Sequence, residues 1–267
     1  MTIRVPPLLG VDAYLGPVPG APSRPPHGGL RETHLALIRF QGQVRRAYVK
    51  HFSVTEPFGL FNEALACTLL SGLGVPCSEG AVLPAPVLGS DEATLAFASL
   101  EAARGFEGTA KQIYQPLGPE QLDEVTRRLH ACAAFASIIA ADQLLGNSDR
   151  NIGNLAFTGP RSIEIFDHEA ILGGAAFPTE RLYEPQVWAR SKLIEDLAPI
   201  QALSPRLKTG IIAAAEVLVD LFYEIQPEFS KAIQVGATGR ATASAEAIRR
   251  RSHEVVGWFR SRLGLLI

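Results

Sequence analysis

The feature that most constrains the fold is a change of pattern near residue 120. Residues 1–120 are rich in glycine, proline and short β-branched or aromatic runs, whereas residues 121–267 carry apolar residues at helical spacing. Strand-like runs followed by helical runs are typical of an α+β architecture. The chain has 267 residues, of which 47% are hydrophobic, so it can bury the core of one large domain or of two lobes.

Composition disfavours several classes of function. The chain has 25 Lys and Arg against 27 Asp and Glu, a net charge of −2, which favours neither a nucleic-acid partner nor an anionic membrane. The short basic run Arg249–Arg251 predicts a solvated helix face. The widely spaced Cys67, Cys77 and Cys132 indicate free thiols in a reducing compartment. The most apolar stretch, residues 131–141, is too short to cross a bilayer and no signal peptide is visible, so we expect a cytoplasmic protein without membrane insertion.

The first part of the chain predicts a β-hairpin. Residues 34–40 and 44–52 are strand-like and are separated by Gln41-Gly42-Gln43. Lys50 shares one face of the second strand with Tyr48. The preceding residues 16–29 contain so much glycine and proline that we expect no regular structure there.

A helix and two more strands are predicted after the hairpin. Residues 61–74 place apolar side chains four positions apart, with Asn62 as the expected N-cap, and glycines followed by Pro76 end the pattern. Residues 79–89 and 93–101 are strand-like. These elements complete a small, mostly β unit with one helix.

The second part predicts a long helix followed by a short hairpin and further helices. Apolar residues at spacings of three and four predict one continuous helix that ends at Gly146: Leu122, Val125, Leu129, Cys132, Ala136 and Ile139. Residues 152–157 and 162–166 predict two short strands joined by a turn at 158–161. From residue 183 onward the pattern is again helical.

A polar cluster, residues 147–154, separates the long helix from the short hairpin. If residues 158–161 form the turn, Asn154 lies opposite Ile165, and Asp167 is its diagonal neighbour on the same face. Diagonal neighbours lie about 7–8 Å apart, so an amide oxygen and a carboxylate can share one ion, and such oxygen ligands suit Mg²⁺. Asp149, on the loop that leaves the helix, can orient a hydroxyl group or accept its proton.

This order of residues matches the requirements of phosphoryl transfer. Enzymes of the protein-kinase type use a loop Asp, an Asn five positions later and a further Asp for base and metal ligands, with a strand Lys and a helix Glu upstream. Lys50 and Glu63 occupy those upstream positions. Each residue alone has an ordinary structural explanation, such as a surface lysine or a helix-terminal glutamate. The five together, in order and on the required elements, favour phosphoryl-transfer chemistry.

The sequence resembles a known family at these positions. AYVKHF, NEALACTLLSGLGVP, GNSDRNIGNLAF and FDHEAILGG are similar to the HipA-like kinases, and related signatures occur in phosphoinositide 3- and 4-kinases. The resemblance spans residues 10–175 and implies a two-lobed protein-kinase-like fold that uses ATP and Mg²⁺. It implies a β-rich N-lobe, residues 1–104, and a mostly helical C-lobe, residues 105–267.

The resemblance also implies a role for each matching residue. Lys50 would hold the nucleotide phosphates and Glu63 would orient it. Asp149 would be the catalytic residue of a loop at 147–154. Asn154 and Asp167 would hold the metal within the hairpin region 152–167. Two departures stand out, because Arg150 follows Asp149 where relatives have His or Gly, and His168-Glu169 follows Asp167. His51 and His168 flank the site, and we expect both to be structural.

Two further nucleotide contacts are expected. The segment PGAPSRPP, residues 19–26, is the nearest candidate for a phosphate-covering loop, with Gly20 and Ser23 as its contacts. Its prolines remove backbone donors. The resemblance makes Ser23 a candidate for self-phosphorylation. Leu100 and Glu101 fall in the expected hinge between the lobes, where the backbone would bind adenine.

Three functions remain open at the level of sequence. The resemblance favours a Ser/Thr kinase that acts on a protein hydroxyl and on itself. A small-molecule or lipid kinase shares the signature, and a nucleotide-binding pseudokinase is the third possibility. No partner motif is visible, so any antitoxin-like partner would be a separate chain.

Overall fold

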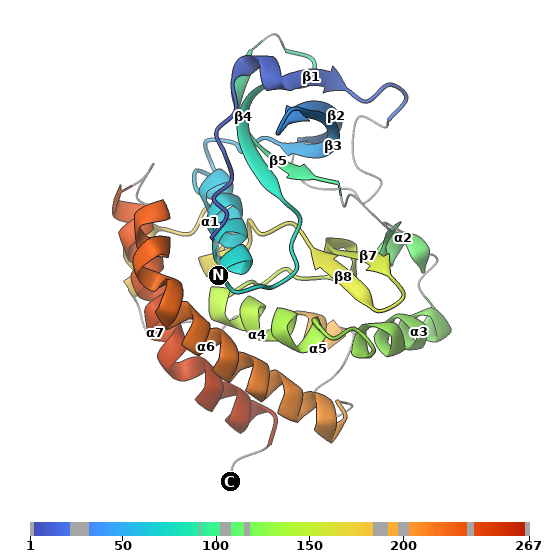
Figure 1. Ribbon diagram of the computed structural model, residues 1–267, viewed down its shortest axis with the longest axis vertical. Helices are drawn as coiled ribbons and strands as arrows, with labels where there is room; N and C mark the ends of the chain where they lie inside the picture. The colour runs from blue at the N-terminus through green and yellow to red at the C-terminus, as the bar shows by residue number, and fades with distance from the viewer. Residues whose placement is uncertain are drawn as a thin grey trace.

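The computed structural model describes residues 3–21, 32–90, 92–101, 108–114, 118–183, 192–196, 203–233 and 238–264. A small β-rich lobe stands above a larger helical lobe, as Figure 1 shows. The α+β, two-lobed architecture expected from the sequence is therefore confirmed. The boundary expected between residues 104 and 105 lies outside the described residues.

The small lobe is built on a five-stranded antiparallel sheet in the order β1-β2-β3-β5-β4. The strands are β1 (Tyr14–Pro17), β2 (Thr33–Phe40), β3 (Gln43–Lys50), β4 (Gly80–Pro86) and β5 (Ala93–Leu100). The predicted hairpin of β2 and β3 is confirmed. Its loop is Gln41-Gly42, and both residues have positive φ (50° and 76°). A two-residue loop with both φ angles positive matches the right-handed twist of the strands.

Helix α1 (Gly59–Gly72) crosses between the two lobes and begins earlier than expected. Asn62 is not its N-cap, because it is the fourth residue of the helix. Its side chain is buried, and Nδ2 donates to the carbonyl oxygens of Glu169 and Ile171 at 2.8 and 3.2 Å. The start of α1 is instead held by the Phe58 N–H, which donates to the carbonyl of Ala175 at 2.9 Å. A tertiary contact replaces the local cap.

The single long helix expected before Gly146 is two helices, α3 (Pro119–His130) and α4 (Phe135–Leu145). The apolar stripe runs through the break. Between the helices the N–H of Cys132 donates to Leu129 and that of Phe135 to Cys132, so the chain tightens into three-residue turns. The sequence there, Ala-Cys-Ala-Ala, contains no helix breaker, which is why periodicity alone missed the interruption. The predicted end at Gly146 is confirmed, with φ +64°.

The remaining elements complete the larger lobe. They are α2 (Ala110–Ile113), α5 (Lys192–Asp196), α6 (Pro205–Ile233), α7 (Thr238–Arg262) and a sheet of β6 (Gly108–Thr109), β7 (Leu155–Gly159) and β8 (Ser162–Ile165). Short 3₁₀ helices lie at Val11–Ala13, Ile152–Asn154, Ile171–Gly173 and Thr179–Tyr183. The main core draws on α1, α4, α6, α7, β7 and β8, and Figure 1 shows α6 and α7 side by side along its flank.

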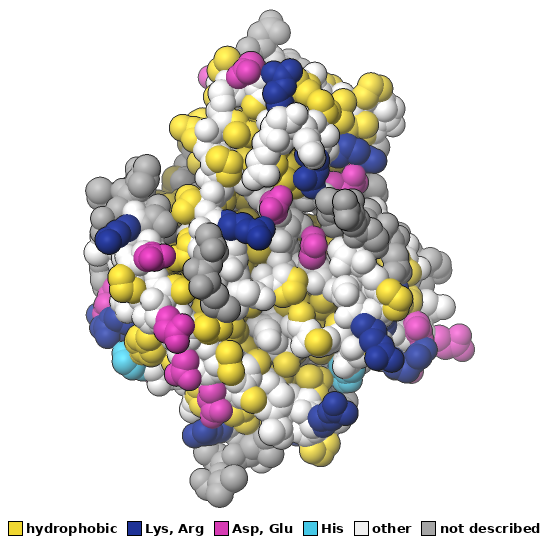
Figure 2. Space-filling view, in the orientation of Figure 1, with side chains coloured by type: hydrophobic (Ala, Val, Ile, Leu, Met, Phe, Trp, Pro, Cys, Tyr) yellow, Lys and Arg dark blue, Asp and Glu magenta, His cyan; other side chains and the backbone are white. Residues whose placement is uncertain are grey.

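None of the helices that the structure describes combines the length and the apolar character needed to cross a membrane. On the face shown in Figure 2, basic and acidic side chains are interspersed among the described residues. That distribution agrees with the balanced charge of the sequence.

Candidate functional site

Lys50 lies at the centre of the candidate site, where three elements meet. It ends β3, its side chain is 8% exposed, and Nζ is 2.6 Å from Glu63 Oε1 on α1. Nζ is also 2.8 Å from Asp167 Oδ1, just after β8. One ammonium therefore ties the small lobe to α1 and to the segment that follows the short hairpin.

Both members of the buried pair have shifted pKa values. Burial lowers the pKa of Lys50, but the carboxylates of Asp167 and Glu63 outweigh it, and the net shift is upward. Burial raises the pKa of Glu63, opposed by the Lys50 ammonium. Glu63 has a second task, because its Oε2 accepts the backbone N–H of His168 at 3.0 Å. The lysine is therefore held as a cation by partners that are themselves anchored.

The backbone geometry that positions Asp167 in this cluster differs from the one that the sequence predicted. The expected register placed Asn154 opposite Ile165, but Leu155 is the residue that pairs with Ile165, and the register shifts once between Phe157 and Gly159. Asn154 instead lies level with Phe166, whose N–H donates to its carbonyl at 3.3 Å. Asp167 lies beyond the strand in a left-handed conformation, with φ +65°. The carboxylate is thus aimed by a backbone kink and not by a strand diagonal.

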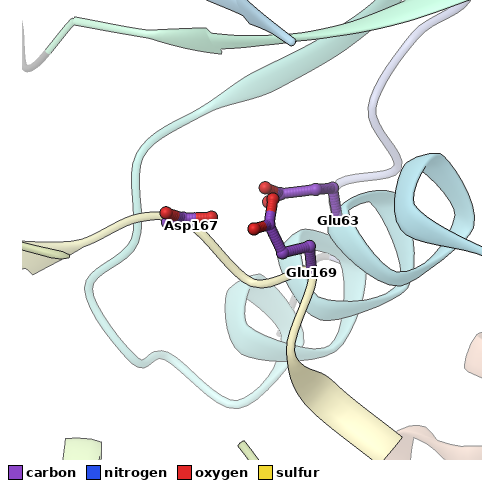
Figure 3. A group of neighbouring side chains, drawn as sticks. All are labelled: Glu63, Asp167 and Glu169. Atoms are coloured by element: carbon purple, nitrogen blue, oxygen red, sulfur yellow. The ribbon is translucent and has the colours of Figure 1, made fainter. Parts of the chain in front are cut away.

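Glu169 is a further acidic residue at the site, and sequence reasoning did not include it. Its Oε2 lies 3.9 Å from Lys50 Nζ. Glu63, Asp167 and Glu169 each place one oxygen within 4.8 Å of the others, and Figure 3 shows their carboxylates converging from α1 and from the segment after β8. Carboxylate oxygens at this spacing suit a hard divalent cation. The only sequence signal was a second acid two positions after Asp167.

The loop that carries Asp149 is held by its own asparagines. The Asp149 N–H donates to Asn147 Oδ1 at 3.1 Å, and the Asp149 carbonyl accepts from Asn151 Nδ2 and Asn154 Nδ2, both at 3.0 Å. The Asn154 amide nitrogen is used in this bond, which leaves its Oδ1 as the atom suited to a metal. The Asp149 carboxylate, 55% exposed, is 2.9 Å from Nζ of Lys192 on α5.

Arg150, which follows Asp149, connects this loop to the backbone of Asp167. Its side chain is fully buried, and Nε and Nη2 each lie 3.1 Å from one oxygen of Asp142 on α4. Nη1 donates to the carbonyls of Phe166 and Asp167, and Nη2 lies 2.9 Å from Nδ1 of His168. Burial, then the charge of Arg150, lowers the pKa of His168 well below its usual value, so this histidine is a neutral structural residue.

A second arginine, Arg251, is partly buried and holds the start of the loop. Arg251 on α7 donates to the carbonyls of Gln143 and Leu144, at 3.1 Å for the shortest bond to each. Gly146 has a positive φ of +64°, which favours glycine, and a Cβ atom there would lie 2.9 Å from the guanidinium carbon of Arg251, so the arginine would have to shift. The expectation of a solvated Arg249–Arg251 face is wrong for Arg251, although Arg249 and Arg250 do pair with Glu246 near the surface.

Three of the other expected nucleotide contacts, Gly20, Leu100 and Glu101, belong to or adjoin strands of the small lobe. Gly20 lies in the turn that follows β1, with φ +74°, and Ser23 is outside the described residues. The N–H groups of Leu100 and Glu101 donate to the carbonyls of Glu79 and Arg46 at 2.8 and 3.0 Å. Those two donors are therefore committed within the small lobe, and a role in binding adenine stays a prediction. His51 is buried, and its Nδ1 lies 3.0 Å from Thr94 Oγ1.

Comparison with known proteins identifies the fold. No protein-family model matches the sequence, and a search of curated proteins finds no relative. Among solved structures, the chain is similar to the Helicobacter pylori proinflammatory kinase CtkA, with a TM-score of 0.61 and 12% sequence identity. The match covers 97% of this chain and 99% of that one. The protein therefore has the two-lobed protein-kinase-like fold.

Proposed function

We propose that the protein is an ATP- and Mg²⁺-dependent kinase that transfers a phosphoryl group to a serine or threonine hydroxyl of a protein, including its own chain. The observation that carries the proposal is the position of Lys50, a buried cation shared by Glu63 and Asp167 where both lobes meet. A structural lysine is rarely buried at such a junction, because desolvating its charge is costly. The kinase-like fold and the motif resemblance support the same conclusion.

The donor set fits both implied groups. Three carboxylates within 4.8 Å of one another are the hard oxygen ligands that Mg²⁺ prefers, and Asn154 Oδ1 is the further ligand that the resemblance implies. Lys50, oriented by Glu63, supplies a positive charge for nucleotide phosphates. Mg²⁺·ATP, when bound, supplies the phosphoryl group and neutralises part of its charge.

The chain's own residues then act on the acceptor. Asp149, held in place by Asn147, Asn151 and Asn154, orients the incoming hydroxyl and accepts its proton. Arg150 and Arg251 keep the loop in register with Asp167 and with α4. Most of the catalysis would come from positioning and charge, as is general for phosphoryl transfer.

The first experiment is the intact mass of the protein after incubation with Mg²⁺ and ATP, beside Asp149→Ala and Asp167→Asn. We expect wild type alone to gain phosphate, with peptide mapping then testing Ser23. Asp123→Asn, which removes an exposed acid on α3, is the matched control and should behave as wild type.

Other outcomes separate the alternatives. ADP release that depends on an added metabolite or lipid, without protein labelling, would favour the small-molecule or lipid kinase. Tight ATP binding without any ADP release would favour the pseudokinase. A wild-type protein that binds no ATP in the presence of Mg²⁺ would contradict the proposal.

A further inference from the structure

The Asp149 carboxylate forms an ion pair that neither the motif nor the resemblance anticipates. Nζ of Lys192 lies 2.9 Å from Asp149 Oδ1, and the two residues are 43 positions apart in the chain. Lys192 opens α5, whereas Asp149 lies on the loop after α4. The contact is thus a product of the fold and not of local chain geometry.

Stability does not explain this pair. The side chains are 41% and 55% exposed, and ion pairs in that setting contribute little because water screens them. The loop itself is already held through the backbone of Asp149, by Asn147, Asn151 and Asn154. The lysine therefore adds nothing that the loop needs in order to fold, and its position beside a reactive carboxylate suggests a part in the chemistry.

The two lysines approach the site from different sides. Lys50 comes from the small lobe, is buried, and is bound to Glu63 and Asp167. Lys192 comes from the larger lobe, is half-exposed, and faces the group that receives the acceptor proton. An acceptor oxygen must come within about 3 Å of Asp149 and about 3–3.5 Å of the phosphorus. An ammonium on a flexible four-carbon stem beside Asp149 can therefore reach the transferring phosphoryl oxygens.

We propose that Lys192 is a catalytic residue that stabilises the phosphoryl group during transfer. This inference rests on the proposed function. The bond from the acceptor oxygen to phosphorus forms, the bond from phosphorus to the ADP oxygen breaks, and the acceptor proton moves to the Asp149 carboxylate. As Asp149 is neutralised, its attraction for Lys192 weakens, and the Lys192 ammonium interacts more strongly with the phosphoryl oxygens. Lys192 stays protonated throughout and transfers no proton.

The test compares Lys192→Met and Lys192→Arg with wild type. Lys231→Met, which removes an exposed lysine near the end of α6, is the control. Three quantities are measured: the rate of ADP release from Mg²⁺·ATP, the affinity for Mg²⁺·ATP, and the affinity for Mg²⁺·ADP with aluminium fluoride, which mimics the phosphoryl group in transfer. Thermal unfolding checks that each variant is folded.

We expect Lys192→Met to lower kcat by on the order of 100-fold, as removal of one transition-state contact does elsewhere. Affinity for the aluminium fluoride complex should fall in parallel, while affinity for ATP and the melting temperature stay unchanged. Lys192→Arg should restore part of the rate, because it keeps the charge.

The two proposals fail in distinguishable ways. If wild type releases ADP and Lys192→Met releases it at the same rate or faster, the role of Lys192 is overturned and the kinase stands. Equal losses of affinity for Mg²⁺·ATP and for the aluminium fluoride complex would also overturn it. Lys192 would then stabilise bound ATP as much as it stabilises the transition state. A wild type that binds no nucleotide removes the proposed function, and the role of Lys192 with it.

Discussion

At the scale of the residue, the charge balance of the site depends on Lys50. Its ammonium is almost inaccessible to water and is bound by Glu63 and Asp167, with Glu169 3.9 Å away. Removing one member of a buried pair leaves uncompensated charge, which is more costly than losing both members. The cluster is therefore sensitive to single substitutions, and the sensitivity depends on pH.

We predict that Lys50→Met lowers the free energy of unfolding by about 3 kcal/mol at pH 7.5. The loss should be smaller at pH 5.5. Burial already raises the pKa of Glu63, and loss of the cation raises it further, so the folded variant takes up a proton as pH falls and the charge penalty disappears. Urea unfolding at both pH values measures the difference.

The double variant Lys50→Met/Glu63→Gln serves as the internal control, since it removes the stranded charge and should recover part of the loss. Equal destabilisation of the single variant at both pH values would show that packing, and not charge, dominates at Lys50.

At the scale of the element, α7 braces the site through two arginines on one face. Arg240 and Arg251 lie eleven residues apart, about three turns of helix. Arg240 donates to the carbonyl of Phe177 at 2.7 Å and lies 4.1 Å over the ring of Phe58, next to the start of α1. Arg251 binds the last carbonyls of α4. One helix thus supports both the helix that carries Glu63 and the start of the Asp149 loop.

We predict that Arg251→Met lowers the free energy of unfolding by about 2 kcal/mol, because two buried carbonyls lose their donor. Burial lowers the pKa of Arg251 to about 10, so the side chain is still charged at neutral pH and methionine cannot replace its bonds. Hydrogen exchange should accelerate across residues 143–154. Urea unfolding and exchange mass spectrometry measure the two effects.

Arg250→Met is the matched control, because that side chain is half-exposed and pairs with Glu246 at the surface. It should change stability by less than about 0.5 kcal/mol. Similar behaviour of the two variants would argue that Arg251 does not brace the loop.

At the scale of the whole molecule, both lobes contribute residues to the site. Helix α1 packs into the core of the larger lobe while Lys50 belongs to the sheet of the smaller one. The small lobe also buries two histidines, His34 and His51, whose rings stack 5.9 Å apart, and the larger lobe buries His168. Burial lowers the pKa of all three.

We predict that the protein loses stability as pH falls from 7.5 to 5.5. The unfolded chain binds protons at histidine near pH 6.5, whereas burial makes the folded chain bind them less readily at these three, so protonation favours unfolding. Below pH 6.5, each of these histidines lowers the free energy of unfolding by up to about 1.4 kcal/mol for each unit of pH. Urea unfolding across the pH range gives the slope.

His168→Gln should reduce this slope while it keeps an acceptor for Arg150. His253→Gln, which replaces an exposed histidine on α7, is the control and should leave the slope as in wild type. A slope that is the same in all three proteins would show that His168 does not contribute to the pH dependence.

Local patterns in the sequence determined a large part of the fold. Alternation and the Gln41-Gly42 loop specify the β2–β3 hairpin, and Gly146 specifies the end of α4. The order of Lys50, Glu63, Asp149, Asn154 and Asp167 is likewise a property of the chain alone. Such features are readable because propensity and periodicity act over a few neighbouring residues.

Only the tertiary structure decided how these pieces meet. The start of α1 and the position of Asp167 depend on contacts with other elements, and neither the break after α3 nor the hairpin register follows from periodicity. The contacts that complete the site join residues far apart in the chain, 117 positions for Lys50 with Asp167, 108 for Arg251 with Gln143 and 43 for Lys192 with Asp149. Side chains so distant leave no periodic trace in one sequence, because only packing brings them within bonding distance.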